Sequence, residues 1–305
     1  MAPLSLTTHL GELGLRSPLI AASGTVGSVW EWAEIADVSW FGAAVAKSVA
    51  LSPWPGRPTP RMSPTSVGML NGIGIQNPGI DQWASTMSPR IPDLAVPVWG
   101  SAVGGEAAEF AKVAERLAAT GVTAVELNLS CPNLDDGEMF SFSAERSAEV
   151  VHECVGSASV PIGAKLSPNT PDVVAVSAAC VEAGASFVTL TNTVLGFGID
   201  VESRRPLLHG GIGGYSGPGI KPFALRCVFE VARELPGVPV VGCGGVRTAH
   251  DVLEYLMAGA SAVAMGTTLL EKPNAGARIG RDLIKLLDKQ GYSSVSAAVG
   301  SVEPW

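Results

Sequence analysis

The sequence contains few cysteines, and no two of them are spaced for a metal centre. The five cysteines are scattered and odd in number, and none belongs to a C-x-x-C motif. Neither a zinc site nor an iron–sulfur cluster therefore has recognisable ligands, and we expect no resident metal. The same scatter argues against a disulfide framework and predicts a reducing, cytoplasmic location.

Charge and long apolar runs are also scarce. Charged residues make up 16% of the 305 residues, and the formal net charge is −8. This balance argues against a broad surface for nucleic acid or for anionic membranes. We find no basic segment followed by an apolar run, and no stretch long enough to cross a bilayer. The hydrophobic content of 47% is ample for a large core. We expect a soluble protein that acts on a small molecule.

Short apolar runs alternate with helical patterns along most of the chain. We expect strands at residues 19–23, 43–47, 96–101, 124–129, 161–166, 187–191, 239–242 and 262–265. Helical patterns between and after them cover residues 106–119, 143–155, 172–183, 222–234, 249–258 and 277–288. Eight such repeats in roughly 250 residues favour an α/β fold of the closed (β/α)₈ TIM-barrel type. An open sheet would need a G-x-G-x-x-G motif after the first strand, and residues 21–25 lack that spacing.

Three further segments complete the expected architecture. Residues 6–15 look like a hairpin that covers the bottom of the barrel. Residues 51–79 and 194–221 are too long for simple turns and are rich in glycine, with proline prominent in the first. We expect them to be long loops over the mouth, where barrels bind their ligands. No linker interrupts the pattern, so residues 1–305 are interpreted as a single domain.

Polar residues cluster where the expected strands end, which is where barrel active sites lie. They are Lys47, Ser48, Asn128, Cys131, Lys165, Ser167, Thr191, Asn192 and Thr193. No histidine falls at these positions, and the Glu126 side chain is expected to point away from the residues around Asn128. Cys131 is therefore the leading candidate for a general base. The alternative is that Cys131 is one more small buried apolar residue.

Two glycine loops and two lysines indicate anionic ligands. Gly244-Gly245 and Gly266-Thr267 follow the last two expected strands, where barrels often hold a phosphate on backbone N–H groups. The alternative is that these glycines only permit tight turns. Lys47 and Lys165 each interrupt an apolar strand, which is costly unless the charge is paired or functional. They are candidates to neutralise an anionic cofactor or substrate, or else they extend to the rim.

Taken together, these motifs resemble those of the flavin-dependent dihydroorotate dehydrogenases, in particular the soluble class 1 branch. The matching segments are residues 22–24, Lys47, residues 59–61, 68–79, 128–133 and 165–169, Asn192-Thr193, residues 214–218, Gly244-Gly245 and Gly266-Thr267. The membrane-associated branch of the family has serine where Cys131 stands. Residues 71–77 and 216–218 look most like class 1B. Enzymes of that subgroup work with a second subunit that carries FAD and an iron–sulfur cluster and passes electrons to NAD.

The resemblance implies an FMN cofactor across the barrel mouth and a homodimer. The FMN-binding candidates are Ser23, Lys47, Ser48, Ser101, Asn128, Lys165, Thr191, Gly217, Gly244, Gly245, Gly266 and Thr267. The candidates for binding the pyrimidine are Lys47, Asn71, Gly72, Ile73, Gly74, Ile75, Asn128, Asn133, Asn192 and Thr193. Cys131 would remove a proton from C5 of dihydroorotate while hydride passes from C6 to flavin N5. The product is orotate, an intermediate of de novo UMP synthesis.

Two departures from the family pattern leave alternatives open. Ser101 stands where the family commonly has asparagine, and residues 134–143 match neither class 1 subgroup closely. A dihydropyrimidine dehydrogenase that acts on dihydrouracil is one alternative, although those enzymes tend to have histidine where Asn133 stands. A non-catalytic barrel that binds a phosphorylated ligand is the other. Lys47 and Asn71 favour a carboxylated ring, because a fixed cation benefits it most.

Overall fold

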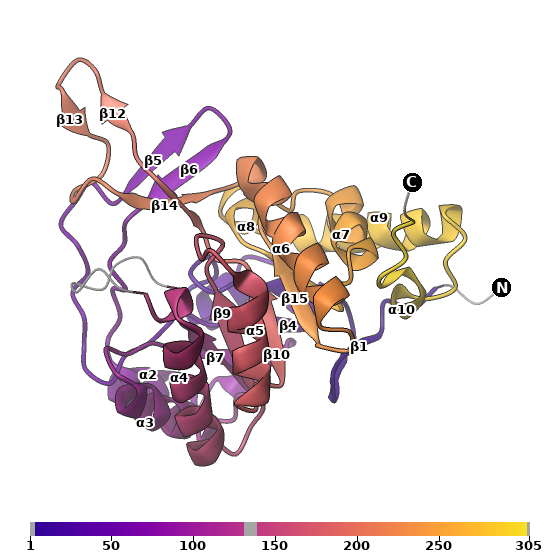
Figure 1. Ribbon diagram of the computed structural model, residues 1–305, viewed down its shortest axis with the longest axis horizontal. Coiled ribbons are helices and arrows are strands. Elements are labelled where there is room, and N and C mark those ends of the chain that lie inside the picture. The colour runs from indigo at the N-terminus through magenta and orange to yellow at the C-terminus, as the bar shows by residue number, and fades with distance from the viewer. Residues whose placement is uncertain (1–3, 131–138, 304–305) are drawn as a thin grey trace.

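The centre of the molecule is a closed barrel of eight parallel strands (Figure 1). The computed structural model describes residues 4–130 and 139–303. Around the barrel, the strands are β3 (Leu19–Ala21), β4 (Ala43–Val45), β7 (Val98–Ala102), β8 (Ala124–Asn128), β9 (Ile162–Leu166), β10 (Phe187–Leu190), β15 (Val240–Cys243) and β16 (Ala262–Met265). Each overlaps one expected strand, so the predicted TIM barrel is confirmed.

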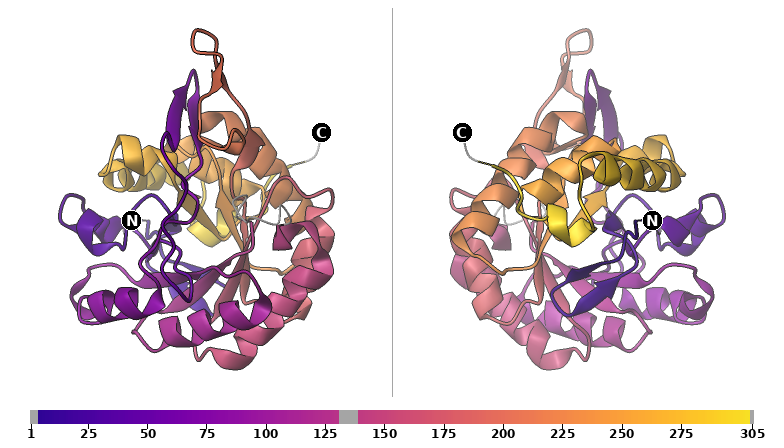
Figure 2. Two further views of the ribbon diagram at one scale, coloured as in Figure 1. Left: turned by 90° about the vertical axis from the view of Figure 1, so that its left-hand side faces the viewer. Right: turned by 90° about the vertical axis from the view of Figure 1, so that its right-hand side faces the viewer.

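Helices surround the barrel (Figure 2). The longer ones are α2 (Ile80–Met87), α3 (Ala107–Ala118), α4 (Ala144–Ser157), α5 (Val173–Glu182), α6 (Lys221–Glu234), α7 (Ala249–Met257) and α9 (Ala275–Lys289). Short turns are α1 (Trp30–Ala33), α8 (Thr267–Glu271), α10 (Val295–Ala298), η1 (Val38–Trp40), η2 (Ile91–Asp93), η3 (Phe140–Phe142) and η4 (Pro218–Ile220). The six expected helices agree within two residues, because local signals mark their ends. For example, Thr248 and Asp251 form a capping box at the start of α7.

The barrel interior is packed with side chains at its lower end. The rings of Trp99 and Phe187 lie 4.9 Å apart there. Gly163 leaves room for Phe187, since a Cβ at residue 163 would lie 2.2 Å from the Phe187 ring. The expected hairpin is present as β1 (Thr8–Leu10) and β2 (Leu13–Leu15). Its Leu10 joins the same buried cluster and closes the bottom of the barrel.

The two long connections form a small sheet rather than loops. Strands β5 (Met62–Thr65) and β6 (Gly68–Asn71) pair with β14 (Gly213–Ser216) and β11 (Val194–Gly196). A further hairpin, β12 (Ile199–Asp200) and β13 (Arg205–Pro206), projects beyond them (Figure 2). The sequence does not reveal these strands, because they are short and rich in glycine and proline. Their partners also lie far away along the chain, as the pairing of Asn71 with Gly214 shows.

Across residues 4–130 and 139–303, no helix has both the length and the hydrophobicity needed to cross a membrane.

Candidate active site

A cavity of about 320 Å³ opens at the carboxyl ends of the barrel strands. The small sheet contributes Met62, Met69 and Ser216 to its wall. The cavity brings together the predicted residues Ser23, Lys47, Ser48, Asn71, Ile73, Ile75, Ser101, Asn128, Lys165, Thr191, Asn192, Thr193, Gly217, Gly244, Gly245, Gly266 and Thr267.

Two predicted residues within the described part of the chain are not among those that line this cavity. Gly72 and Gly74 belong to the same segment as Asn71, but they lie close to Arg57 instead. Cys131 and Asn133 lie outside the described residues.

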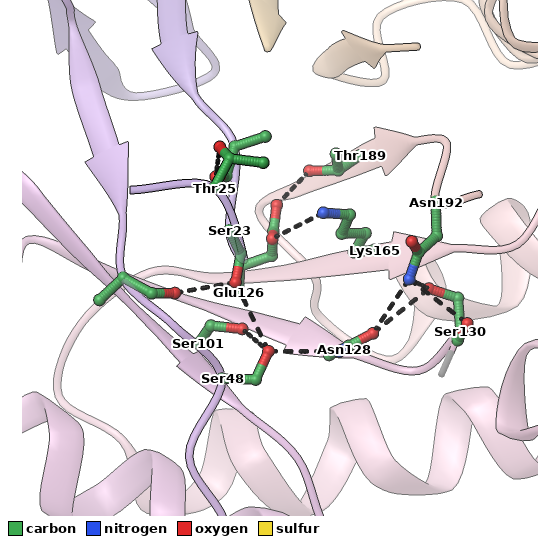
Figure 3. Close-up of polar contacts among 12 residues, drawn as sticks. Ser23, Thr25, Ser48, Ser101, Glu126, Asn128, Ser130, Lys165, Thr189 and Asn192 are labelled. Atoms are coloured by element: carbon green, nitrogen blue, oxygen red, sulfur yellow. Dashed lines mark hydrogen bonds and ion pairs between the residues drawn. The ribbon is translucent and has the colours of Figure 1, made fainter. Parts of the chain in front are cut away.

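Carboxamides and hydroxyls form one hydrogen-bonded row along the ends of β8 and β10 (Figure 3). Asn192 Nδ2 donates to the hydroxyl of Ser130 at 2.8 Å. Asn192 Oδ1 accepts from the backbone N–H of Thr193 at 2.8 Å, which orients the amide. Asn128 Nδ2 donates to Ser48 Oγ at 3.2 Å. These contacts leave a fixed set of amide groups around Ser130, which precedes Cys131 in the sequence, and this set suits a ring with alternating donors and acceptors.

Ser101 belongs to the wall of this site. Its hydroxyl lies 2.9 Å from that of Ser48, and both side chains are buried. Ser23 donates to the carbonyl oxygen of Ala46 at 2.8 Å. The serine that departs from the family pattern is thus held by a neighbouring hydroxyl. Ser48 links it to Asn128 and so to the amide row.

The floor of the cavity holds a carboxylate, contrary to our expectation for Glu126. Glu126 and Lys165 both line the cavity, and their charged atoms lie 3.8 Å apart (Figure 3). Thr189 donates to the other Glu126 oxygen at 2.8 Å. The expectation was wrong because side chains two residues apart on a strand share a face. Glu126 therefore lies on the same side as Asn128, and this parity was the signal available in the sequence.

The glycine loops supply unpaired backbone donors. Gly244 and Gly245 adopt φ values of 147° and 71°. A Cβ at Gly244 would lie 2.7 Å from Ala224 Cβ, so this turn leaves no room for a side chain. Among the described residues, the N–H groups of Gly244, Gly245 and Gly266 donate no hydrogen bond. Donors of this kind at a cavity wall suit a phosphate, which supports the anion reading over that of simple turns.

Neither the histidines nor the described cysteines offer a base in the cavity. The histidines lie elsewhere than in its wall. Cys243 does line it, but burial raises the pKa of its thiol, and the nearby Lys165 lowers it only in part. Within the described parts of the chain, no cluster of His, Cys, Asp and Glu side chains is arranged to hold a metal ion.

Comparison with known proteins places this chain in a family. The family model described as "Dihydroorotate dehydrogenase" matches residues 5–287. The chain belongs to the dihydroorotate dehydrogenase family. The family recognised from the sequence motifs is therefore confirmed. Confirmed with it are the enzyme class, an oxidoreductase acting on a CH–CH bond, and the role in pyrimidine biosynthesis. Members of this family depend on a flavin.

Similar curated proteins are named dihydroorotate dehydrogenase B (NAD(+)), catalytic subunit. The protein from Pelobacter propionicus is 41% identical over 300 residues, covering 98% of each chain. The one from Geobacillus kaustophilus is 41% identical, covering 97% of this chain and 95% of the relative. A crystal structure of DHODH from Eimeria tenella, in complex with ferulenol, has a TM-score of 0.82 at 18% identity. That match covers 97% of this chain and 88% of the other. It supports the barrel fold alone.

Proposed function

We propose that this chain oxidises (S)-dihydroorotate to orotate with FMN bound across the barrel mouth and Cys131 as the base. The observation that carries the proposal is the composition of one cavity. It combines unpaired glycine N–H groups, a buried lysine and a fixed row of carboxamides. A phosphorylated flavin and a cyclic imide that carries a carboxylate need these three features together.

The residues present fit FMN. The backbone of Gly244, Gly245 and Gly266 would hold its phosphate, and Lys165 would donate to the electron-rich side of the ring. The hydroxyls of Ser23 and Ser48 lie on the same wall. When bound, the flavin supplies a hydride acceptor for C6 of the substrate.

The substrate would lie against the amide row. Asn128, Asn192 and Thr193 would bind its ring amide groups, and Lys47 with Asn71 would bind its carboxylate. Asn71 is already positioned, because its Nδ2 donates to the carbonyl oxygen of Gly214 at 3.2 Å. Fixed groups of this kind orient the ring without reorganisation during the reaction.

Cys131 would take the proton from C5. It follows Ser130 directly, and Ser130 is held by Asn192 at the edge of the cavity. The thiolate is the basic form, and nearby cations favour it. Loss of the proton from C5 and of hydride from C6 leaves the C5–C6 double bond of orotate.

We further propose that electrons leave through a separate subunit that carries FAD and an iron–sulfur cluster and reduces NAD. The names of the similar proteins, which are catalytic subunits of NAD(+) enzymes, support this. A homodimer of this chain is proposed from the family resemblance.

Anaerobic reduction of the bound flavin tests the substrate. The purified protein, supplied with FMN, should show a flavin absorbance band that dihydroorotate bleaches and dihydrouracil does not. Bleaching by dihydrouracil alone would select the dihydropyrimidine enzyme instead. Failure to bind FMN would remove the catalytic proposal altogether. Adding NAD, fumarate and a quinone separately, with and without a co-expressed partner subunit, then identifies the acceptor.

A further inference from the structure

Glu126 and Lys165 form a buried ion pair at the floor of the cavity. Glu126 is 2% exposed and Lys165 is 7% exposed. Lys165 Nζ lies 3.8 Å from Glu126 Oε1, which is close enough for strong attraction but too long for a hydrogen bond. Glu126 Oε1 accepts no hydrogen bond from any described residue. The carboxylate is fixed through its other oxygen, to which Thr189 donates at 2.8 Å.

Three adjacent strands build this arrangement. Glu126 lies on β8, Lys165 on β9 and Thr189 on β10, and Thr189 is the register partner of Lys165. The carboxylate therefore lies between its hydrogen-bond donor and the ammonium group. Because each residue projects from a regular barrel strand, the geometry depends on the rigid part of the fold.

The ammonium group of Lys165 has donors to spare. It makes the ion pair with Glu126 and no hydrogen bond to any described residue. An ammonium group carries several N–H donors, and leaving them unpaired in a buried site costs free energy. They therefore remain for a ligand in the cavity that both side chains line.

Stability alone does not explain the pair. A buried ion pair is often matched or exceeded in stability by apolar residues of similar size. Here one carboxylate oxygen, Glu126 Oε1, also accepts no hydrogen bond from a described residue, so the Thr189 hydrogen bond compensates for the burial of the carboxylate only in part. A role toward a ligand accounts for a charge that packing does not require.

We propose that Glu126 is a positioning residue that keeps Lys165 charged and directed at the flavin, and that it thereby sets how readily the flavin accepts electrons. This inference rests on the proposed function, since it needs FMN in the cavity. A carboxylate close to the ring opposes the addition of electrons, and the ammonium group favours it. The pair together moderates the field that either charge would create alone.

The charged and titratable groups around Lys165 determine how removal of the Glu126 carboxylate would change the pKa of Lys165. Glu126 faces it from β8 and Cys243 from β15, while Lys47 lies in the wall of the same cavity. The Tyr255 hydroxyl donates to the carbonyl oxygen of Gly244 nearby. Burial is the largest single influence on the pKa of Lys165 and lowers it, but the attraction of Glu126 together with that of Cys243 outweighs burial, so the net pKa is raised. Without the carboxylate, burial would dominate and this pKa would fall.

The test is a pH series of the flavin midpoint potential and absorbance spectrum in Glu126→Gln holoenzyme. At acid pH, where Lys165 keeps its proton, we expect reduced FMN to be favoured about tenfold more. That change is a rise of about 30 mV for a two-electron couple. As pH increases, Lys165 of the variant should lose its proton. The flavin midpoint potential and spectrum of the variant should then show an added transition, at a pH where wild type shows none.

Three further variants separate this role from packing. Thr189→Val removes the hydrogen bond but keeps both charges, and Glu126→Asp keeps the carboxylate, so both should stay near wild type. The double variant Glu126→Gln/Lys165→Met must lose the added transition, whereas titration of the flavin itself persists. The inference is overturned if FMN binds and Glu126→Gln follows wild type, or if Thr189→Val behaves as Glu126→Gln does. Wild type that binds no FMN would instead refute the proposed function.

Discussion

The carboxamide nitrogen of Asn192 lies 2.8 Å from the hydroxyl oxygen of Ser130, and this contact joins the ends of β10 and β8. The same nitrogen lies 3.4 Å from Asn128 Oδ1. Since Thr193 N–H holds the Asn192 oxygen, the amide has one orientation. A ligand that enters the cavity therefore meets an amide that is already fixed, beside the residue that precedes Cys131.

Replacing Asn192 tests that row of amides. Asn192→Asp removes the donor and adds a negative charge near an anionic substrate. A hydrogen bond of this type is worth about 1.5–3 kcal/mol when a charged group takes part, so the Kd of orotate should rise roughly 10- to 100-fold. Titration of the flavin spectrum with orotate measures it. Ser130→Ala, which removes only the partner, should weaken binding less. Equal affinity in Asn192→Asp and wild type would contradict the assignment.

Cys131→Ala tests the base. General base catalysis contributes about 10²- to 10⁴-fold, so the rate of flavin reduction by dihydroorotate should fall by that factor. FMN should remain bound, because the substitution leaves the glycine loops that are proposed to hold its phosphate unchanged. Stopped-flow absorbance under anaerobic conditions measures the rate. Cys180→Ala, at a buried cysteine in α5, is the matched control and should reduce at the wild-type rate. A wild-type rate in Cys131→Ala would exclude it as the base.

The proposed role of the Gly244-Gly245 loop in binding the FMN phosphate can be tested with two glycines that both have positive φ. Gly245 has φ 71° and Gly237 has φ 91°, so alanine at either position is strained by about 1–2 kcal/mol. A Cβ at Gly245 would lie 2.8 Å from Lys221 Cβ, whereas one at Gly237 meets nothing within 4 Å.

Only Gly245→Ala should therefore weaken FMN binding, by at least about tenfold, or about 1.4 kcal/mol. Flavin fluorescence during titration of apoprotein measures the Kd. Comparable FMN affinity in the two variants would argue against the loop as the phosphate site.

Stability should fall in alkaline solution because of buried thiols. Burial raises the pKa of Cys154 from 9.0 to about 12. Between these values the unfolded chain loses a proton that the folded chain keeps. The free energy of unfolding therefore decreases as pH rises, by up to about 1.4 kcal/mol per pH unit for this thiol. Urea denaturation between roughly pH 8 and 11 measures this decrease in the free energy of unfolding, because that range covers the lower part of the interval between the two pKa values of Cys154.

Cys154→Ala should flatten that dependence. Val151→Ala, which removes buried apolar volume from the same helix, should lower stability at every pH without changing the slope. An unchanged slope in Cys154→Ala would show that this thiol does not carry the effect.

The regular part of the fold could be predicted because its signals are local. Each barrel strand is a short apolar run between turn residues, and helices such as α7 carry capping residues at their ends. Residues at the carboxyl ends of parallel strands must converge in a closed barrel. This convergence is why Lys47, Asn128 and Lys165 could be proposed as neighbours before their contacts were known.

The sequence by itself determined the barrel, the family and the types of polar residue at its mouth, because periodicity, turn residues and motif spacing are properties of neighbouring positions. Only the tertiary structure decided that Glu126 faces Lys165 and that Thr189 holds the carboxylate. It also decided that residues around Asn71 and Gly214 pair as a sheet over the cavity. These contacts join distant positions whose own neighbours do not specify them, so they arise only when the strands take their register.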